Sequence, residues 1–267
     1  MKISIVGCGN MGLAYARSFL KYNLVTKENL LLVEKNEARK EALEKLAIGN
    51  VVSNFDATIG GYDIIILAVK PQDFSAISEG LKNALTPKNT ILSIMAGIPI
   101  KQLEQKLAHK SIVRAMPNSP AQLGMGMTAF ACAKEMSMEQ LRKVENLLSS
   151  TGRTVYLEDE SLLDAVTALS GSGPAYFFYI VKYMIEAGIK MGMEPSVASL
   201  LVKQTMIGSF ELINSASQNL DELIAAVKSK GGTTEAALNQ FTEGRLGDTL
   251  VTGILAAEKR ATELSNS

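Results

Sequence analysis

The chain is poor in the residues that metal sites, disulfides and catalytic triads need, because its 267 residues include one histidine and two cysteines. Cys8 and Cys132 form no CxxC pair, match no zinc-site spacing and build no disulfide framework. We therefore expect no metal site and a reducing, cytoplasmic compartment. His109, the one histidine, lies at the expected end of a helix, where we expect an exposed capping residue rather than a catalytic one.

An excess of one charge is also absent, because 27 Lys and Arg residues balance 27 Asp and Glu residues. We therefore expect neither a nucleic acid nor a membrane as partner. The longest apolar run, residues 64–69, is too short to cross a bilayer, and the N-terminal residues show no signal-peptide pattern. A hydrophobic share of 47% is typical of a globular protein with a substantial core.

Short apolar runs alternate with helical patterns in the first part of the chain. This alternation is typical of βαβ units and a largely parallel sheet. The runs are continuously apolar, which predicts strands buried on both faces. We expect strands at 3–7, 30–34, 63–69, 90–96, 111–116, 127–133 and 154–157, and helices at 10–21, 36–46, 72–85, 99–108 and 137–150.

Only helical patterns follow residue 158. The helix expected at 174–192 is apolar around much of its circumference, which is typical of a helix buried on several sides. A partner subunit would cover it readily, so we expect a homo-oligomer. The fold class is thus an α/β domain at 1–158 followed by an all-α C-terminal domain at 159–267. Its helices are expected at 160–169, 174–192, 195–214, 219–228, 233–243 and 247–264.

The first strand runs into GCGNMG, a GxGxxG motif that opens a helix. In this context the motif predicts a Rossmann-type dinucleotide-binding domain. Gly7 permits the tight turn, Gly9 lets the backbone approach a pyrophosphate, and Gly12 allows close helix packing. The helix start at Asn10 and Met11 supplies free N–H groups to the anion.

The second strand ends at Glu34, where an acidic residue commonly bonds the ribose of NAD and repels the 2′-phosphate of NADP. Lys35, Asn36 and Arg39 follow directly and offer groups that could hold that phosphate. They are equally consistent with a solvated helix start. These residues therefore leave NADPH and NADH open.

Later strands end at the same carboxyl edge, where open α/β sheets bind ligands. Lys70 could reach a phosphate, a ribose or a substrate carboxylate, or be a plain surface charge. The further cofactor-binding residues expected at this edge are Ala68, Val69, Lys70, Pro71, Ala96, Gly97 and Asn118.

SGSGPAY (170–176) and SKGGTTEAAL (229–238) follow in the helical part. Together with GCGNMG, LAVKP and RAMPNSPA, they make the chain resemble pyrroline-5-carboxylate reductase over essentially its whole length. The resemblance implies reduction of 1-pyrroline-5-carboxylate to L-proline, the last step of proline biosynthesis, with NADPH as cofactor and NADH possible. It also implies a homodimer or larger homo-oligomer whose helical domain binds the substrate and dimerises.

The resemblance further implies individual site residues. Thr234 corresponds to the family's candidate partner for the ring nitrogen and is our catalytic residue. Asn54 falls where the family places an asparagine on the adenosine. We expect Ser170 to Gly173 to end one helix near Leu169 and form the floor of the active site before Pro174 starts the next. The substrate-binding residues are Ser172, Gly173, Val227, Ser229, Gly231, Gly232 and Thr233.

Two positions depart from the family pattern. Lys230 replaces the usual proline of SPGGTT, which loosens the turn and brings a positive charge near an anionic substrate. Ser217 stands where the family often has a glutamate. Both changes bear on affinity and exact substrate rather than on the reaction class.

The proposed chemistry needs little from the protein. A protonated cyclic imine is already electrophilic, so hydride transfer requires mainly position and orientation. The N–H groups at 231–234 can bind a carboxylate, and we expect Thr234 to orient the ring before it acts as an acid. GGTTEAAL also reads as a simple helix start, with Thr233 as N-cap.

Two other functions are compatible with the two-domain plan. A 3-hydroxyacid-type dehydrogenase needs a lysine base, and Lys182 lies nine residues beyond Gly173. Glu186 stands where that scheme expects an asparagine, so we favour Lys182 as a solvent-reaching residue. A non-catalytic NAD(P)-binding regulatory paralogue is supported only by the two departures.

Overall fold

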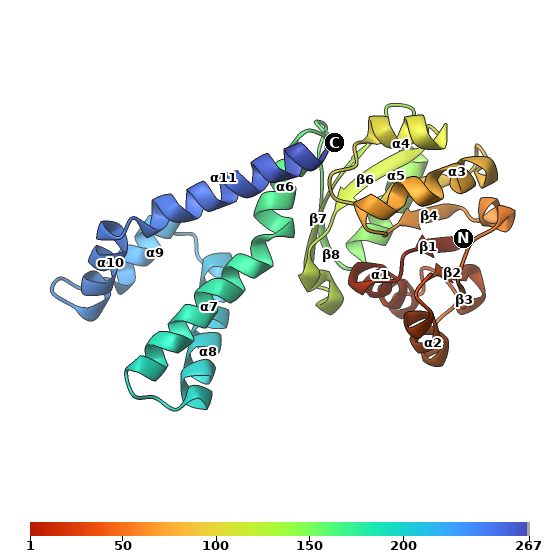
Figure 1. Ribbon diagram of the computed structural model, residues 1–267. Helices are drawn as coiled ribbons and strands as arrows, with labels where there is room; N and C mark the ends of the chain where they lie inside the picture. The colour runs from red at the N-terminus through yellow and green to blue at the C-terminus, as the bar shows by residue number, and fades with distance from the viewer. Residues whose placement is uncertain (266–267) are drawn as a thin grey trace. The chain divides into compact units, whose positions relative to one another are not determined.

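The computed structural model describes residues 1–265 and divides the chain into two compact units. The first comprises Met1–Pro174 and the C-terminal residues from Ala257 on, and the second comprises Ala175–Ala256 (Figure 1). Residues 159–174 therefore pack with the α/β part, although we expected them to open the helical domain.

The first unit is built on one eight-stranded sheet of order β3-β2-β1-β4-β5-β6-β7-β8. Neighbouring strands are parallel except for β6 and β7. The predicted strands and the α/β fold are confirmed. Strand β3 was not predicted, because a strand of three partly exposed residues shows no buried-strand pattern. The strands are β1 Ile3–Val6, β2 Leu30–Val33, β3 Asn50–Val52, β4 Ile64–Leu67, β5 Thr90–Ser93, β6 Ile112–Met116, β7 Gly126–Cys132 and β8 Gly152–Tyr156.

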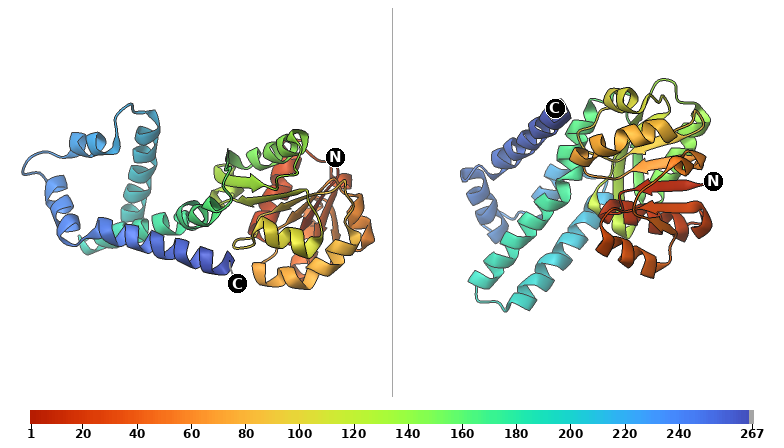
Figure 2. Two further views of the ribbon diagram at one scale, coloured as in Figure 1. Left: turned by 90° about the horizontal axis from the view of Figure 1, so that it is seen from above. Right: turned by 45° about the vertical axis from the view of Figure 1, so that its right-hand side comes forward.

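Helices cover both faces of this sheet (Figure 2). Because side chains alternate along a strand, Ile66 packs into the cluster that holds Tyr15 and Phe19, while Ile65 packs into the one that holds Phe74. Burial on both faces explains why the strands are continuously apolar. One face carries α1 (Asn10–Lys21), α2 (Glu37–Leu46) and α5 (Met138–Ser149), and the other carries α3 (Phe74–Ala84) and α4 (Ile100–Leu107).

The prediction of an irregular turn from Leu169 to Pro174 is wrong. After α6 (Leu162–Val166) the chain makes one π-helical turn, η5 (Thr167–Gly171), and continues as α7 (Gly173–Lys190). The Ser172 N–H donates to the Thr167 carbonyl at 2.9 Å, five residues back. A π turn absorbs one extra residue without breaking the helix, and such turns are frequent at functional sites.

His109 is also placed differently from the prediction. Helix α4 ends at Leu107, and Ala108 takes a left-handed conformation with φ 49. This turn brings His109 inward, where the ring is buried and its Nε2 lies 2.8 Å from the Asn89 carbonyl oxygen. The prediction that His109 is an exposed capping residue is therefore wrong. Its ring is packed at the amino-terminal edge of the sheet.

The second unit is helical, as predicted, and has few buried side chains in the single chain. Phe178 and Tyr179 on α7 are 68% and 61% exposed, so the apolar helix is not covered within the single chain. Such an apolar surface is typical of a protein interface. No helix among residues 1–265 combines the length and hydropathy needed to cross a membrane. The helices are α8 (Pro195–Ser215), α9 (Leu220–Val227), α10 (Thr233–Glu243) and α11 (Leu246–Ser265), the last of which ends in the first unit.

Candidate active site

The glycine turn after β1 is tightly packed on one side. Gly7 has φ +96, and a Cβ placed on it would lie 2.8 Å from the Ala68 carbonyl and from the Val69 nitrogen. A Cβ on Gly12 would collide with the Gly7 carbonyl oxygen. Both positions therefore require glycine, and α1 starts directly against the β1 turn.

The other side of the turn is open. A Cβ on Gly9 would meet nothing within 4 Å. Gly9 is the N-cap of α1, makes no side-chain cap, and is followed by a first turn without an acidic residue. The N–H groups of Asn10 and Met11 thus start a helix whose positive end is not neutralised. This open cradle fits the pyrophosphate of a dinucleotide.

Cys8 lies in this turn as a packing residue. Its Sγ lies 3.8 Å from the carbonyl oxygens of Ile5 and Val33. Burial, followed by the nearby Glu34 carboxylate, raises the pKa of the thiol to about 12. The thiol is therefore protonated at neutral pH and is no nucleophile.

The residues after β4 and β5 share the edge of the Gly7 turn. The strands run in register, with Val6 beside Leu67 and Leu67 beside Ser93. Ala68, Val69 and Pro71 are half-buried, whereas Lys70 is exposed. Ala96 is half-buried, and Gly97 is buried with φ +71.

Glu34 follows β2 directly and is buried, and its carboxylate accepts hydrogen bonds from the backbone. One oxygen accepts the Cys8 N–H at 3.3 Å, and the other accepts the Asn36 N–H at 2.9 Å. The Asn36 side chain caps α2 by accepting the Arg39 N–H at 3.0 Å. The helix-start interpretation therefore holds for Asn36, and Glu34 ties the glycine turn to the end of β2.

Two cations and an asparagine are exposed near these strand ends. Lys35 pairs with Asp73, a residue that we did not predict, at 3.1 Å. Arg39 is exposed on the first turn of α2. Asn54 is exposed two residues after β3, which is parallel to β2.

Asn118 connects the loop after β6 to the π turn. Its Oδ1 accepts the Met127 N–H at 2.9 Å, and its Nδ2 donates to the Ser170 Oγ at 3.2 Å. A Cβ on Gly171 would lie 2.5 Å from Met116 Cε, so Gly171 packs closely on the Met116 side chain of β6. The structure thus brings the SGSG segment to the same end of β6 as Asn118.

Ser172 and Gly173 complete this segment. Ser172 is half-buried and Gly173 is buried. A Cβ on Gly173 would meet nothing within 4 Å, so no protein atom requires a glycine there. The role of both residues as the floor of the site stays a prediction.

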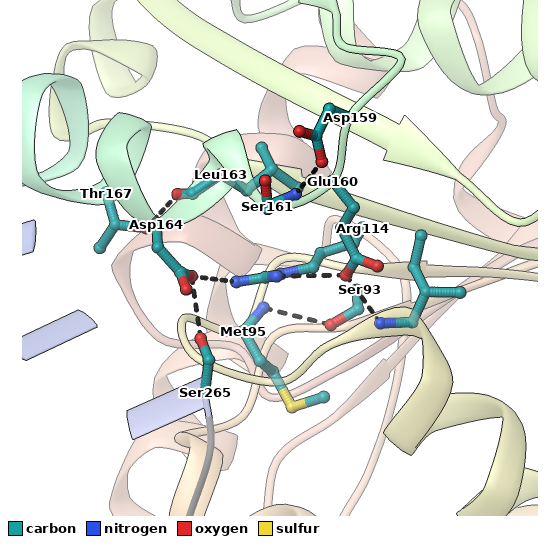
Figure 3. Close-up of polar contacts among 11 residues, drawn as sticks. Ser93, Met95, Arg114, Asp159, Glu160, Ser161, Leu163, Asp164, Thr167 and Ser265 are labelled. Atoms are coloured by element: carbon teal, nitrogen blue, oxygen red, sulfur yellow. Dashed lines mark hydrogen bonds and ion pairs between the residues drawn. The ribbon is translucent and has the colours of Figure 1, made fainter. Parts of the chain in front are cut away.

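A buried ion-pair cluster lies beneath this end of the sheet (Figure 3). Arg114 on β6 pairs with Glu160 at 3.1 Å and with Asp164 at 2.8 Å. We did not predict it. The available signal was an arginine within the otherwise apolar run IVRAM, because a buried charge requires partners.

The second unit contains the start of α10. Gly232, with extended backbone, is the N-cap, so the expectation that Thr233 caps the helix is wrong. Glu235 in the first turn accepts the Gly231 N–H at 2.7 Å and lies 3.8 Å from the Lys228 ammonium. Thr234 is half-buried at the second helical position. The remaining predicted residues Val227, Ser229, Gly231 and Thr233 are exposed, and Gly232 is half-buried.

Among residues 1–265, no group of three or more His, Cys, Asp or Glu side chains is placed so that it could hold a metal ion. Lys182, the base of the alternative dehydrogenase, is exposed and lies 5.3 Å from the Tyr183 ring centroid. This exposed position agrees with the interpretation of Lys182 as a residue that reaches into solvent.

Two family models match the chain. The model for pyrroline-5-carboxylate reductase dimerisation covers residues 160–264, and a model for coenzyme F420-dependent NADP oxidoreductases covers residues 2–97. Pyrroline-5-carboxylate reductases of Pseudomonas aeruginosa and Aquifex aeolicus are each 36% identical, over 99% of this chain and 97% of the relative. These matches span both predicted parts of the chain.

Solved structures agree. Plasmodium falciparum pyrroline carboxylate reductase with NADP bound has a TM-score of 0.89 at 27% identity, over 99% of this chain and 98% of its own. The Coxiella burnetii pyrroline-5-carboxylate reductase has a TM-score of 0.88 at 28% identity, over 100% and 99%. The resemblance read from the motifs is confirmed, and neither alternative function is favoured. The chain belongs to the pyrroline-5-carboxylate reductase family.

Proposed function

We propose that this chain reduces 1-pyrroline-5-carboxylate to L-proline with NAD(P)H, the last step of proline biosynthesis. The observation that carries the proposal is the open, uncapped glycine cradle at Gly9, in a chain that matches reductases of this name over nearly its full length. NADPH, when bound, supplies the hydride. The chain's own task is to bind and orient the two reactants.

The cofactor site uses the carboxyl edge of the sheet. Backbone N–H groups at the start of α1 hold the pyrophosphate, and Asn54 contacts the adenosine. The nicotinamide end is bordered by residues 68–71, by Ala96 and Gly97, and by Asn118. Support comes from the shared register of β1, β4 and β5 and from the bond between Asn118 and Ser170.

NADPH is the preferred donor and NADH is accepted. Lys35 and Arg39 are exposed cations that can meet a 2′-phosphate. Glu34 is buried, and each of its carboxylate oxygens already accepts a backbone N–H group. It is therefore less able to bond a ribose diol than a free acid would be, yet its charge still opposes the phosphate. The two effects partly cancel.

In the second unit, the substrate-binding residues are those at 227–234. In the first unit, Ser172 and Gly173 keep their predicted substrate-binding role. The N–H groups of the α10 start bind the carboxylate, and the Thr234 hydroxyl orients the ring nitrogen. A threonine is a weak acid at neutral pH, so water delivers the proton. Lys230 adds a positive charge to this turn.

The assembly is a homodimer or a larger homo-oligomer, and residues 159–267 supply its substrate-binding and dimerisation functions. Support comes from the dimerisation model over residues 160–264 and from the exposed aromatic side chains of α7. The two free cysteines favour a reducing cytoplasm, and the balanced charge favours a small-molecule substrate without a nucleic acid or membrane partner.

A direct assay tests the proposal. Purified protein is incubated with pyrroline-5-carboxylate and either NADPH or NADH, and cofactor oxidation is followed together with proline formation. Turnover with both cofactors and a higher kcat/KM for NADPH is expected. No proline with either cofactor would refute the function, and oxidation of 3-hydroxyacids in the reverse direction would favour the dehydrogenase instead.

A further inference from the structure

Arg114 binds two carboxylates from the segment that leads into the π turn. Its side chain is 5% exposed, with Nη1 3.1 Å from Glu160 and Nη2 2.8 Å from Asp164 (Figure 3). Both acids are largely buried as well, at 28% and 12% side-chain exposure. A buried guanidinium with two well-placed carboxylates holds its neighbours in one geometry, because separating the charges leaves them unpaired.

Glu160 extends this hold to the loop after β5. The oxygen that meets Arg114 also accepts the Ile100 N–H at 2.8 Å. Ile100 is the first residue of α4, whose N-cap Pro99 makes no side-chain cap. Glu160 therefore supplies the missing cap and fixes the end of the loop that carries Ala96 and Gly97.

Asp164 is connected to the same loop through the C-terminal end of α11. Its Oδ1 also accepts the Ser265 hydroxyl at 2.8 Å. The preceding residue, Leu264, packs on the loop, because a Cβ placed on Gly97 would lie 3.0 Å from Leu264 Cβ. The last turn of α11 is thus tied to the sheet edge by the cluster and presses on Gly97.

The strand that carries Arg114 also positions the π turn. Met116, two residues along β6, fills the space beside Gly171, and Asn118 bonds Ser170. Asp164 starts the same stretch from the other end, because α6 runs directly into that turn. One arginine therefore connects the loop at 96–97 with the segment at 170–173.

We propose that Arg114 is a positioning residue for hydride transfer, acting through Glu160 and Asp164 to hold the nicotinamide-side loop and the π turn in their productive geometry. The inference rests on the proposed function, which places the reactants at these two segments. A misplacement of about 1 Å between reacting groups costs on the order of 100-fold in rate. Loosening the cluster should therefore lower the rate of hydride transfer in protein that remains folded.

The test compares Arg114→Met and Arg114→Lys with Leu147→Ala, a fully buried residue of α5 on the opposite face of the sheet. Three quantities are measured: the NADPH dissociation constant by fluorescence titration, kcat, and the isotope effect on kcat with NADPH deuterated at the transferred position. Arg114→Met should lower kcat by on the order of 100-fold, raise the isotope effect and weaken NADPH severalfold. Arg114→Lys should recover part of the rate, and Leu147→Ala should lower the melting temperature without changing the isotope effect.

An unchanged kcat and isotope effect in folded Arg114→Met, or the same change in Leu147→Ala, would overturn the proposal. Should Arg114→Met not fold, Glu160→Gln and Ser265→Ala each remove one bond of the cluster and are judged by the same readouts. Failure of the proposed function is distinguishable, because the unsubstituted protein would then bind NADPH without forming proline. In that case a raised NADPH dissociation constant in Arg114→Met supports the positioning role and an unchanged one overturns it.

Discussion

The starts of α1 and α10 are built from similar sequence and held in different ways. Both helices follow a glycine-containing turn, and neither Gly9 nor Gly232 provides a side-chain cap. Before α1, backbone atoms of Ala68 and Val69, which follow β4, leave no room for a Cβ on Gly7, and the Gly7 carbonyl oxygen leaves none for a Cβ on Gly12. The cofactor turn is therefore rigid because the core of the sheet is packed against it.

The α10 turn lacks that support in the single chain. A Cβ on Gly231 would meet nothing within 4 Å, and the turn is closed by the Glu235 carboxylate on the Gly231 N–H. No acidic residue occupies the first turn of α1. The α1 start is therefore set by packing, whereas the α10 start is set by a hydrogen bond between a carboxylate and a backbone amide.

The largest effect is expected at Gly12. Gly12→Val drives a side chain into the Gly7 carbonyl, so it should abolish measurable NADPH binding and lower the free energy of unfolding by about 1–3 kcal/mol. Gly9→Ala is the matched control, because its Cβ points into open space. Gly9→Ala should leave the free energy of unfolding unchanged and lower only the affinity for NADPH. A stable Gly12→Val protein with normal affinity would contradict a packing-defined turn.

Thr234 should show the next largest effect. Thr234→Ala removes the hydroxyl that orients the ring nitrogen and should lower kcat/KM roughly 10–100-fold, as for a hydrogen bond to a charged group. Thr233→Ala, at the exposed neighbouring position, should change it little. Equal kinetics in the two variants would reduce Thr234 to an ordinary helix residue.

Gly231 offers a direct contrast with Gly12. Its φ of +73 makes Gly231→Ala strained, yet the added methyl meets open space. A cost of about 1–2 kcal/mol in unfolding free energy is expected from the left-handed conformation alone, with NADPH affinity unchanged. Chemical denaturation and fluorescence titration measure the two quantities. Loss of NADPH binding would show that the two turns are not independent.

Lys230 should act through its charge. Lys230→Gln removes an exposed cation near an anionic substrate and should raise the substrate KM by about two- to threefold at low salt. The difference should vanish at about 1 M salt, where the screening length is about 3 Å. A KM difference that survives high salt would mean that Lys230 makes a direct contact instead.

Cys8 should have the smallest effect, and only at high pH. Burial raises the pKa of its thiol from the ordinary value of 9.0 to about 12 in the folded chain. Below about pH 9 both states are protonated and the stabilising contribution is fully present; between about pH 9 and 12 the unfolded thiol ionises first and the contribution is lost. Cys8→Ala should therefore flatten the fall in melting temperature above pH 9. An unaltered fall would mean that the thiol is not the group responsible.

The elements with a clear period were predictable from the sequence. The continuous apolar strands and the GCGNMG turn identify the sheet, its two covered faces and the cofactor edge. β3 was not predictable, because a three-residue strand at the sheet margin carries too little pattern. The π turn was not predicted, because glycine and proline usually indicate a helix break. In the structure, the turn joins α6 to α7 and Gly171 packs on Met116, so the helix continues.

The burial of particular side chains was harder to predict. The sequence indicates that α7 is apolar, but it does not say which surface covers it, and Phe178 is 68% exposed in the single chain. His109 was expected at the surface because it follows a helix. The left-handed Ala108 turns it toward Asn89 instead.

The family, the reaction class and the glycine turns can be predicted from the sequence alone, because positive φ, apolar periodicity and short motifs are properties of neighbouring residues. The hydrogen bonds of Glu34 to the backbone and the contacts among Arg114, Asp164 and Ser265 arise only when the chain folds. Arg114 and Asp164 are 50 residues apart in the chain, and Asp164 and Ser265 are 101 apart. No local pattern encodes such a pairing, because it depends on which strand and helix ends the folded core brings within hydrogen-bond distance.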